Sequence, residues 1–276
     1  MTGQAGTYPN FTTKAKVRYI NSEWRDSDEI PRVGSRETRR ANTSFQDVDI
    51  LDARPRLDAG EIDLDRSGFT LTNHATKITD FRDKDAVAET YYPEIKDLVR
   101  RVTGADRVFM RGHLIRTETP IDFNDGYSRF VHCDYNVARQ YDMAQELFER
   151  DGVTPGDDWT YVWYNTWQPF DHPVRNNPLA VIDWQSLPMG DVIDYYYTGR
   201  GQDSLVAAPV YSPGHQFWYF PNMETDEIMV FTQIDTRSGH AVYCPHTSFD
   251  VLDAPEGSPP RRSIETRVLA IFENEE

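Results

Sequence analysis

Short segments rich in aromatic and β-branched residues recur from residue 107 onward, separated by turns that contain glycine or proline. Such segments are typical of β-strands, and the turn residues mark their ends. The segments do not alternate with helices as they do in a parallel α/β sheet. The pattern therefore favours a mainly β protein, a barrel or sandwich. The expected strands are 107–117, 160–170, 215–220, 226–235, 240–246 and 263–272.

Two segments have the apolar spacing of an amphipathic helix. The first runs from Tyr91 to Gly104, and the second runs from Val137 to Arg150 and stops at Gly152. Glycine commonly follows a helix because it adopts the left-handed conformation there without steric cost. We expect both helices to flank the β-structure rather than to form its core.

Residues 1–60 are polar and broken into short runs, which predicts an extended arm with short strands. The whole chain, 1–276, fits a single all-β domain with this arm packed on it. A hydrophobic fraction of 38% and an aromatic fraction of 13% are enough for a packed core.

The chain is acidic, with 29 lysines and arginines against 45 aspartates and glutamates and a net charge of −16. This charge repels phosphates, so neither nucleic acid nor an anionic membrane is an expected partner. No segment approaches the roughly 20 apolar residues of a membrane helix. The N-terminus has no apolar signal-peptide core, and two cysteines are too few for a disulfide scaffold. We expect a cytoplasmic protein, and the sequence does not indicate its oligomeric state.

The candidate chemistry begins at His132 and Asp134, which flank Cys133. On a strand these two side chains share a face, because successive side chains point to opposite sides. A histidine and a carboxylate with one further histidine form the facial triad of non-haem iron(II) oxygenases. Taken alone, the pair is better explained as a partly buried hydrogen-bonded contact than as a metal site.

His246, far downstream, supplies the second histidine if a return strand brings it beside His132. Arg261 and Ser263 follow, again on one strand face. A guanidinium and a hydroxyl on one face can bind a carboxylate, as the distal end of 2-oxoglutarate requires. The alternative for Arg261 is a surface salt bridge. The combined order predicts an iron(II) site that uses 2-oxoglutarate and O2, with no catalytic residue beyond the metal ligands.

The five remaining histidines are expected at the surface or beside the metal ligands without binding the metal, and His113 is the strongest candidate for an exception. They are His74, His113, His172, His215 and His240. Structural zinc is not expected, because the chain has no C-x-x-C pair and Cys133 faces away from His132.

These segments resemble the CmcJ-like family, also described as hydroxylase/desaturase AsaB-like, from about Asp49 to Phe272. The matching stretches include GFTLTNHATKITDF, VHCDY, YNTWQPF, FWYFPNMETDEIMVFTQID and PPRRSIETRVLAIF. The resemblance implies a double-stranded β-helix (a cupin-like jelly roll) with flanking helices, and an iron(II)/2-oxoglutarate oxygenase of secondary metabolism. It places the metal at His132, Asp134 and His246.

The resemblance also places the co-substrate at Arg261 and Ser263. The family usually has an acidic residue between these two positions, whereas this chain has Arg262. Alternation directs Arg262 away from the clamp face. A β-bulge could nevertheless exchange the two arginines, so which one binds 2-oxoglutarate stays open.

Further candidates surround these positions. Asn165 and Trp167 share a strand face in a segment that lies near the iron in the family, and both are candidates for co-substrate binding. Core packing explains the tryptophan equally well. Arg116, Tyr127 and Tyr135 are candidates for contacting the substrate.

Glu265 and Arg267 lie on the same face as Arg261 and could form a buried ion pair that orients it.

The predicted function is oxidation of an unactivated C–H bond of a small natural product, by hydroxylation or desaturation, with release of succinate and CO2. One alternative is a redox-silent cupin-like isomerase or lyase with zinc or manganese. Another is a non-catalytic ligand-binding protein. The paired Arg261 and Ser263 favour the first, because neither alternative needs a clamp for a dicarboxylate.

Overall fold

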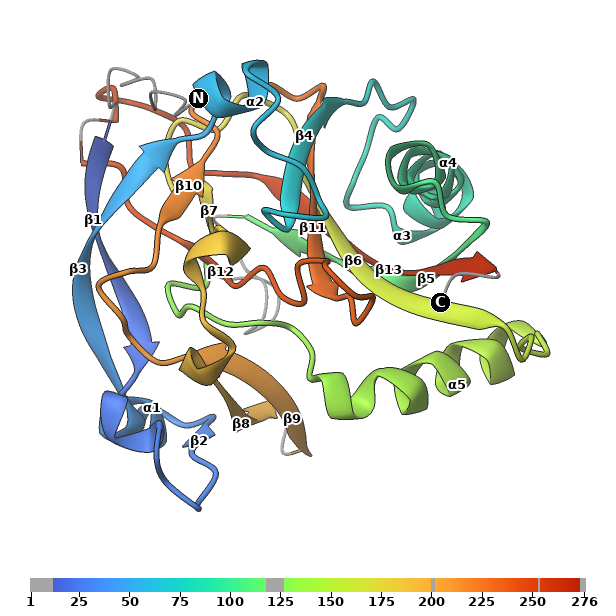
Figure 1. Cartoon of the computed structure of the whole chain (residues 1–276). Helices are drawn as coiled ribbons and strands as arrows, with labels where there is room; N and C mark the ends of the chain where they lie inside the picture. The colour runs from blue at the N-terminus through green and yellow to red at the C-terminus, as the bar shows by residue number, and fades with distance from the viewer. Residues whose placement is uncertain (1–11, 118–126, 200–201, 253, 274–276) are drawn as a thin grey trace, which may run out of the picture.

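The computed structural model describes residues 12–117, 127–199, 202–252 and 254–273, and it confirms the mainly β class. Two five-stranded sheets and one three-stranded sheet account for the strands of these ranges (Figure 1). The first sheet has the order β1 (Thr12–Ile20), β3 (Thr43–Asp52), β10 (Phe217–Tyr219), β7 (Leu179–Ile182) and β12 (His246–Ser248). The second has the order β4 (Phe69–Asn73), β11 (Glu227–Ile234), β6 (Trp159–Pro169), β13 (Ser263–Glu273) and β5 (Arg107–Arg116). The third is β2 (Arg32–Val33), β8 (Val192–Gly199) and β9 (Gln202–Pro209).

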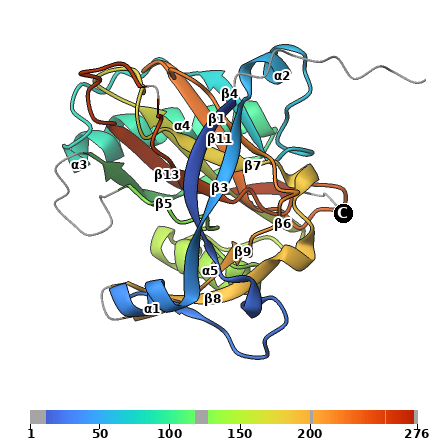
Figure 2. The same cartoon turned by 90° about the vertical axis from the view of Figure 1, so that its left-hand side faces the viewer.

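The two large sheets pack against each other through one buried cluster. It joins Trp167 of β6 and Phe231 of β11 to Val181 of β7 and Trp218 of β10. Alternation along each strand sends these apolar side chains inward. Figure 2 shows β1 and β3 crossing in front of the second sheet. Within the expected arm 1–60, these are two long strands paired from Thr12–Leu51 to Ile20–Thr43, while residues 1–11 lie outside the described ranges.

Two of the helices cover the second sheet, one on its outer face and one at one end of its inner face. The helices are α1 (Arg36–Asn42), α2 (Arg54–Asp58), α3 (Lys84–Ala86), α4 (Tyr92–Thr103) and α5 (Gln140–Asp151). A π-helical turn, Val87–Tyr91, precedes α4, and 3-10 turns span Ser22–Trp24, Val137–Arg139, Trp184–Ser186 and Met189–Asp191. None of the helices in the described ranges is long and apolar enough to cross a membrane.

The two predicted helices are confirmed as α4 and α5. Each ends at a glycine in the left-handed region, Gly104 with φ 77° and Gly152 with φ 66°. Helix α4 buries Leu98 against the outward side chains of the second sheet, whereas α5 buries Leu147 against inward ones such as Trp163. The helices therefore lie on opposite faces of one sheet, as Figure 1 shows.

The segment 128–135 departs from the prediction, because it is extended but belongs to no long strand. The Val131 amide donates to Arg18 of β1, and the Cys133 amide donates to Ala207 of β9. Between them, His132 bridges to His246 of β12. The segment thus crosses from one sheet to the next. The predicted strand 240–246 is likewise wrong over most of its length, and only its last residue belongs to a strand.

Candidate metal and co-substrate site

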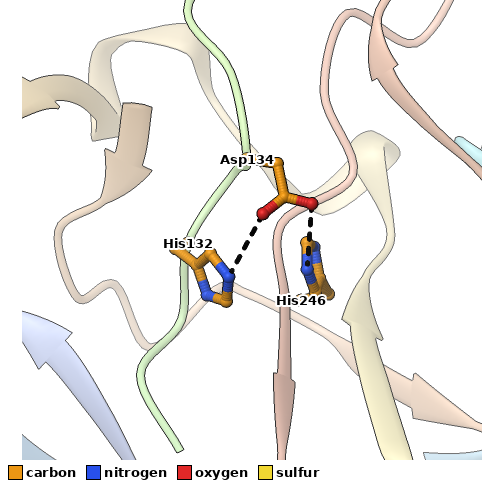
Figure 3. Close-up of side chains that lie close together, drawn as sticks. All are labelled: His132, Asp134 and His246. Carbon is orange, nitrogen blue, oxygen red and sulfur yellow. Dashed lines mark ion pairs between the residues drawn. The ribbon is translucent and has the colours of Figure 1, made fainter. Parts of the chain in front are cut away.

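Three chemically suitable side chains meet at this junction (Figure 3). His132 and Asp134 come from the extended segment, and His246 is the first residue of β12. The His132 amide donates to the His246 carbonyl at 3.2 Å, and the His246 amide returns a bond of 3.0 Å. Main-chain hydrogen bonds therefore set the spacing of the two histidines.

The ligand-type atoms of the three residues all lie within 4.8 Å of one another. His132 Nε2 is 3.7 Å from Asp134 Oδ1, and His246 Nε2 is 3.9 Å from Asp134 Oδ2. Metal–ligand bonds of about 2.0–2.2 Å place the ligands of one ion about 3 Å apart or more. Two imidazoles and one carboxylate at this spacing are a donor set that suits iron(II).

The protonation states also suit a metal. His132 Nδ1 donates to the Phe130 carbonyl at 2.7 Å, which leaves its Nε2 lone pair free on the side of Asp134. Burial, with a contribution from His132, lowers the pKa of His246 to about 3. Burial opposes the charge on Asp134, but Arg267 and both histidines hold the pKa of its carboxyl well below the usual range. Neutral imidazoles and an ionised carboxylate are what a divalent ion requires.

Asp134 is held from three sides. Asn165 of β6 donates to its Oδ2 at 2.5 Å, and Arg267 of β13 donates to its Oδ1 at 2.7 Å. Its backbone amide donates to the Gln233 side chain at 2.9 Å. Asn165, a candidate for the co-substrate, therefore contacts the candidate metal ligand in this structure.

The ion pair expected between Glu265 and Arg267 is present, with Arg267 Nε donating to Glu265 at 3.0 Å. The pair was expected to orient Arg261. Instead, a terminal nitrogen of Arg267 donates to Asp134. The sequence did not predict the contacts of Arg267, Gln233 and Asn165 with Asp134. The contact of Arg267 follows from the strand register, because Arg267 lies directly opposite Asn165 across β13 and β6. This register cannot be read from the sequence.

Arg261 and Ser263 lie at the start of β13. Arg261 is only 3% exposed, and its guanidinium lies 4.4 Å from the centre of the Tyr127 ring and 5.6 Å from that of Trp167. One terminal nitrogen donates to the Asn177 carbonyl at 2.8 Å. Arg261 Nε and Ser263 Oγ are buried and have no hydrogen-bond partner within the described part of the chain. Buried polar atoms are rarely left in this state unless a ligand satisfies them.

Arg261 stays charged although its burial and the nearby Arg116 oppose the charge. Burial and the nearby Arg116 lower the pKa of Arg261 to about 9, which leaves it a cation at neutral pH. The Tyr127 hydroxyl donates to the Arg261 carbonyl at 2.6 Å. Arg116 stands directly opposite Ser263 across β5 and β13. Three of the predicted residues, Arg116, Tyr127 and Trp167, therefore surround Arg261.

Arg262 points elsewhere. Its side chain is 32% exposed and pairs with Asp171 at 2.9 Å. Tyr135, the remaining candidate, is buried with its ring 5.2 Å from that of Trp163, on the side of the site that carries Arg267. It packs in the cluster beneath α5 and lies away from Arg261.

Sequence comparison places the chain among oxidoreductases. A family model described as an oxidoreductase/YMDC permease-like domain matches residues 13–271. The chain is 32% identical to the hydroxylase/desaturase efuI of Hormonema carpetanum, over 89% of this chain and 90% of that protein. It is 31% identical to the alpha-ketoglutarate-dependent dioxygenase phiK of a fungal species, over 84% of this chain and 86% of that protein.

Structural comparison identifies the same architecture. A variant of the iron and alpha-ketoglutarate-dependent endoperoxidase NvfI superposes with a TM-score of 0.83 at 23% identity, covering 98% of this chain and all of that one. The unaltered enzyme superposes with a TM-score of 0.80 at 24% identity, covering 95% of this chain and 98% of that one. The likeness confirms the jelly-roll fold.

Proposed function

The chain belongs to the family of iron(II)- and 2-oxoglutarate-dependent dioxygenases and hydroxylase/desaturases, and we propose that His132, Asp134 and His246 bind its iron. The protein is an oxygenase whose cofactors are Fe(II), 2-oxoglutarate and O2. The observation that carries the residue assignment is the convergence of three ligand-type atoms within 4.8 Å. A redox-silent isomerase and a non-catalytic binding protein are set aside, because the relatives described above are dioxygenases and hydroxylase/desaturases.

We further propose that Arg261 and Ser263 bind the distal carboxylate of 2-oxoglutarate. Arg261 Nε and Ser263 Oγ are buried donors without a partner in the described ranges, and both belong to one end of β13. A carboxylate satisfies both donors and neutralises the buried cation. Arg262 is already paired with Asp171, so the proposal assigns the clamp to Arg261.

Iron, with 2-oxoglutarate and O2, supplies the oxidising power that removes hydrogen from a substrate C–H bond, releasing succinate and CO2. The residues around the site hold the metal ligands and the co-substrate in position. Asn165 fixes the Asp134 carboxylate, and the Phe130 carbonyl fixes the ring of His132. Trp167 and Tyr127 flank the cation that orients the co-substrate and shield it from water.

The proposed substrate is a small natural product that is hydroxylated or desaturated. Arg116 and Tyr127 adjoin the clamp, and Tyr135 packs beside Arg267, so these three remain the proposed substrate-side residues. The proposed compartment is the cytoplasm, since Cys133 and Cys244 are both free thiols, as in a reducing environment.

The metal assignment is tested by replacing its ligands. His132→Ala and Asp134→Ala should lose bound iron and succinate release together, because two remaining ligands do not hold the ion. His240→Gln is the matched control, since His240 Nδ1 lies 3.2 Å from Asp235, outside the site, and this variant should keep both properties. Full iron content and succinate release in Asp134→Ala would overturn the assignment.

A further inference from the structure

Arg267 is a partly buried cation that contacts two buried carboxylates. One terminal nitrogen of its guanidinium is 2.7 Å from Asp134 Oδ1 and 3.0 Å from Glu265, and its Nε also donates to Glu265. The guanidinium therefore joins a carboxylate of β13 to the carboxylate of the extended segment. A single partly buried arginine thus links the second sheet to the candidate metal ligand.

Asn165 completes the arrangement on the other oxygen of Asp134. Because Asn165 and Arg267 are paired residues on adjacent strands, their side chains leave the same face of the sheet side by side. Each oxygen of a carboxylate has two acceptor positions. With one donor on each oxygen, the plane of the Asp134 carboxylate is fixed and each oxygen keeps one position for another partner.

We propose that Arg267 is a positioning residue for iron binding, which orients Asp134 and is itself oriented by Glu265. This proposal rests on the assignment of Asp134 as an iron ligand. The alternative is that Arg267 only neutralises buried charge and holds β13 in place. The two roles differ in one respect, because only positioning requires the forked shape of the guanidinium.

Lysine separates shape from charge. Arg267→Lys keeps a cation but has a single nitrogen, which cannot reproduce both the Nε bond to Glu265 and the bond of the terminal nitrogen to Asp134. Arg267→Met removes both properties. Loss of a partner that orients a metal ligand typically weakens metal binding about 10- to 100-fold. We expect that range for Arg267→Met, a smaller but distinct loss for Arg267→Lys, and a several-fold loss for Glu265→Gln.

The measurement is the Kd for Mn2+ of the metal-free protein, followed by the electron paramagnetic resonance signal of free Mn2+ without 2-oxoglutarate or substrate. This readout does not depend on turnover. Arg237→Met is the matched control, because Arg237 is also a partly buried arginine paired to an acid, Asp235, but its guanidinium lies over Phe272 in the cluster on the outer face of the second sheet. It should leave the Kd for Mn2+ unchanged even if it lowers Tm.

Wild-type affinity for Mn2+ in Arg267→Met, or in Arg267→Lys and Glu265→Gln if the methionine variant does not fold, would overturn the positioning role. Full rescue by lysine would also overturn it and leave only charge compensation. Asp134→Ala distinguishes this failure from failure of the iron site. If Asp134→Ala binds Mn2+ normally, the ligand assignment itself is wrong. If Asp134→Ala loses binding and Arg267→Met does not, the positioning proposal alone fails.

Discussion

His132 and His246 are joined backbone to backbone by two hydrogen bonds of 3.2 and 3.0 Å, which hold their ring centres 4.5 Å apart. The bridge ties the extended segment to β12, so a metal held by both imidazoles also ties the two backbones together. Metal binding and the stability of this junction are therefore coupled.

Binding of a divalent metal should raise Tm. A ligand that binds only the folded protein stabilises it by about 2.7 kcal/mol at 100 times its Kd. For a chain of this size, that corresponds to about 5–10 °C. Thermal unfolding with Mn2+ and with a chelator measures the shift. His246→Ala should show no shift, and an equal shift in that variant would place the metal elsewhere.

The two adjacent arginines should differ sharply in their effect on 2-oxoglutarate. Loss of one charge-assisted hydrogen bond costs about 1.5–3 kcal/mol, or roughly 10- to 150-fold in affinity. Arg261→Ala should raise the KM for 2-oxoglutarate by about that factor, measured by succinate release. Arg262→Ala is the control, because its partner is Asp171 at 2.9 Å. A larger effect of Arg262→Ala would reverse the assignment.

Ser263 should contribute less than Arg261. Its buried hydroxyl is a neutral donor, and a neutral hydrogen bond contributes about 0.5–1.5 kcal/mol. Ser263→Ala should raise the KM for 2-oxoglutarate about 2- to 12-fold while leaving Tm without 2-oxoglutarate near its wild-type value. An unchanged KM would show that the hydroxyl does not face the co-substrate.

Local patterns allowed much of this fold to be predicted. The strands near 160–170 and 263–272 carry aromatic and β-branched runs, and they are the central pair of the second sheet. Gly104 and Gly152 end their helices because both occupy left-handed backbone conformations. The three metal residues could also be predicted, because their types and their order along the chain are visible in the sequence. In the structure their ligand atoms lie close together.

The features that the sequence did not predict depend on hydrogen bonds and strand register between segments far apart in the chain. The segment 128–135 forms main-chain hydrogen bonds with β1, β9 and β12. The residue pattern within the segment does not reveal these partners. The contact of Arg267 with Asp134 depends on the register of β13 against β6. His74 and His215 were expected at the surface or beside the metal ligands. Both side chains are buried, and their partners are Gln168 for His74 and Tyr19 for His215.

The packing of α4 predicts a stability defect that leaves the site intact. Leu98 is fully buried between α4 and the outer face of the second sheet. Leu98→Ala should lower the free energy of unfolding by about 2.7–5 kcal/mol, through lost burial and the cavity left behind. Urea unfolding measures the loss. Leu252→Ala is the control, because Leu252 is 72% exposed, and the Kd for Mn2+ should be unchanged in both variants.

A buried polar cluster joins β1 to the loop before β10. The His215 side chain is 1% exposed, with Nε2 donating to Asp191 at 3.0 Å and Nδ1 accepting from the Tyr19 hydroxyl at 3.0 Å. Arg25 pairs with the same aspartate and neutralises it. Burial and Arg25 together lower the pKa of His215 to about 4.

Stability should therefore fall in acid through His215. Its pKa is about 4 in the folded protein and 6.5 in the unfolded chain, so the unfolded chain binds the extra proton between these values. The contribution is complete above pH 6.5 and is lost as the pH falls toward 4, on the order of 3 kcal/mol. His215→Gln keeps an uncharged donor for Asp191 and acceptor for Tyr19. Urea unfolding from pH 7 to 5 should show a shallower loss in this variant than in wild type, whereas parallel curves would mean that His215 is protonated equally in both states.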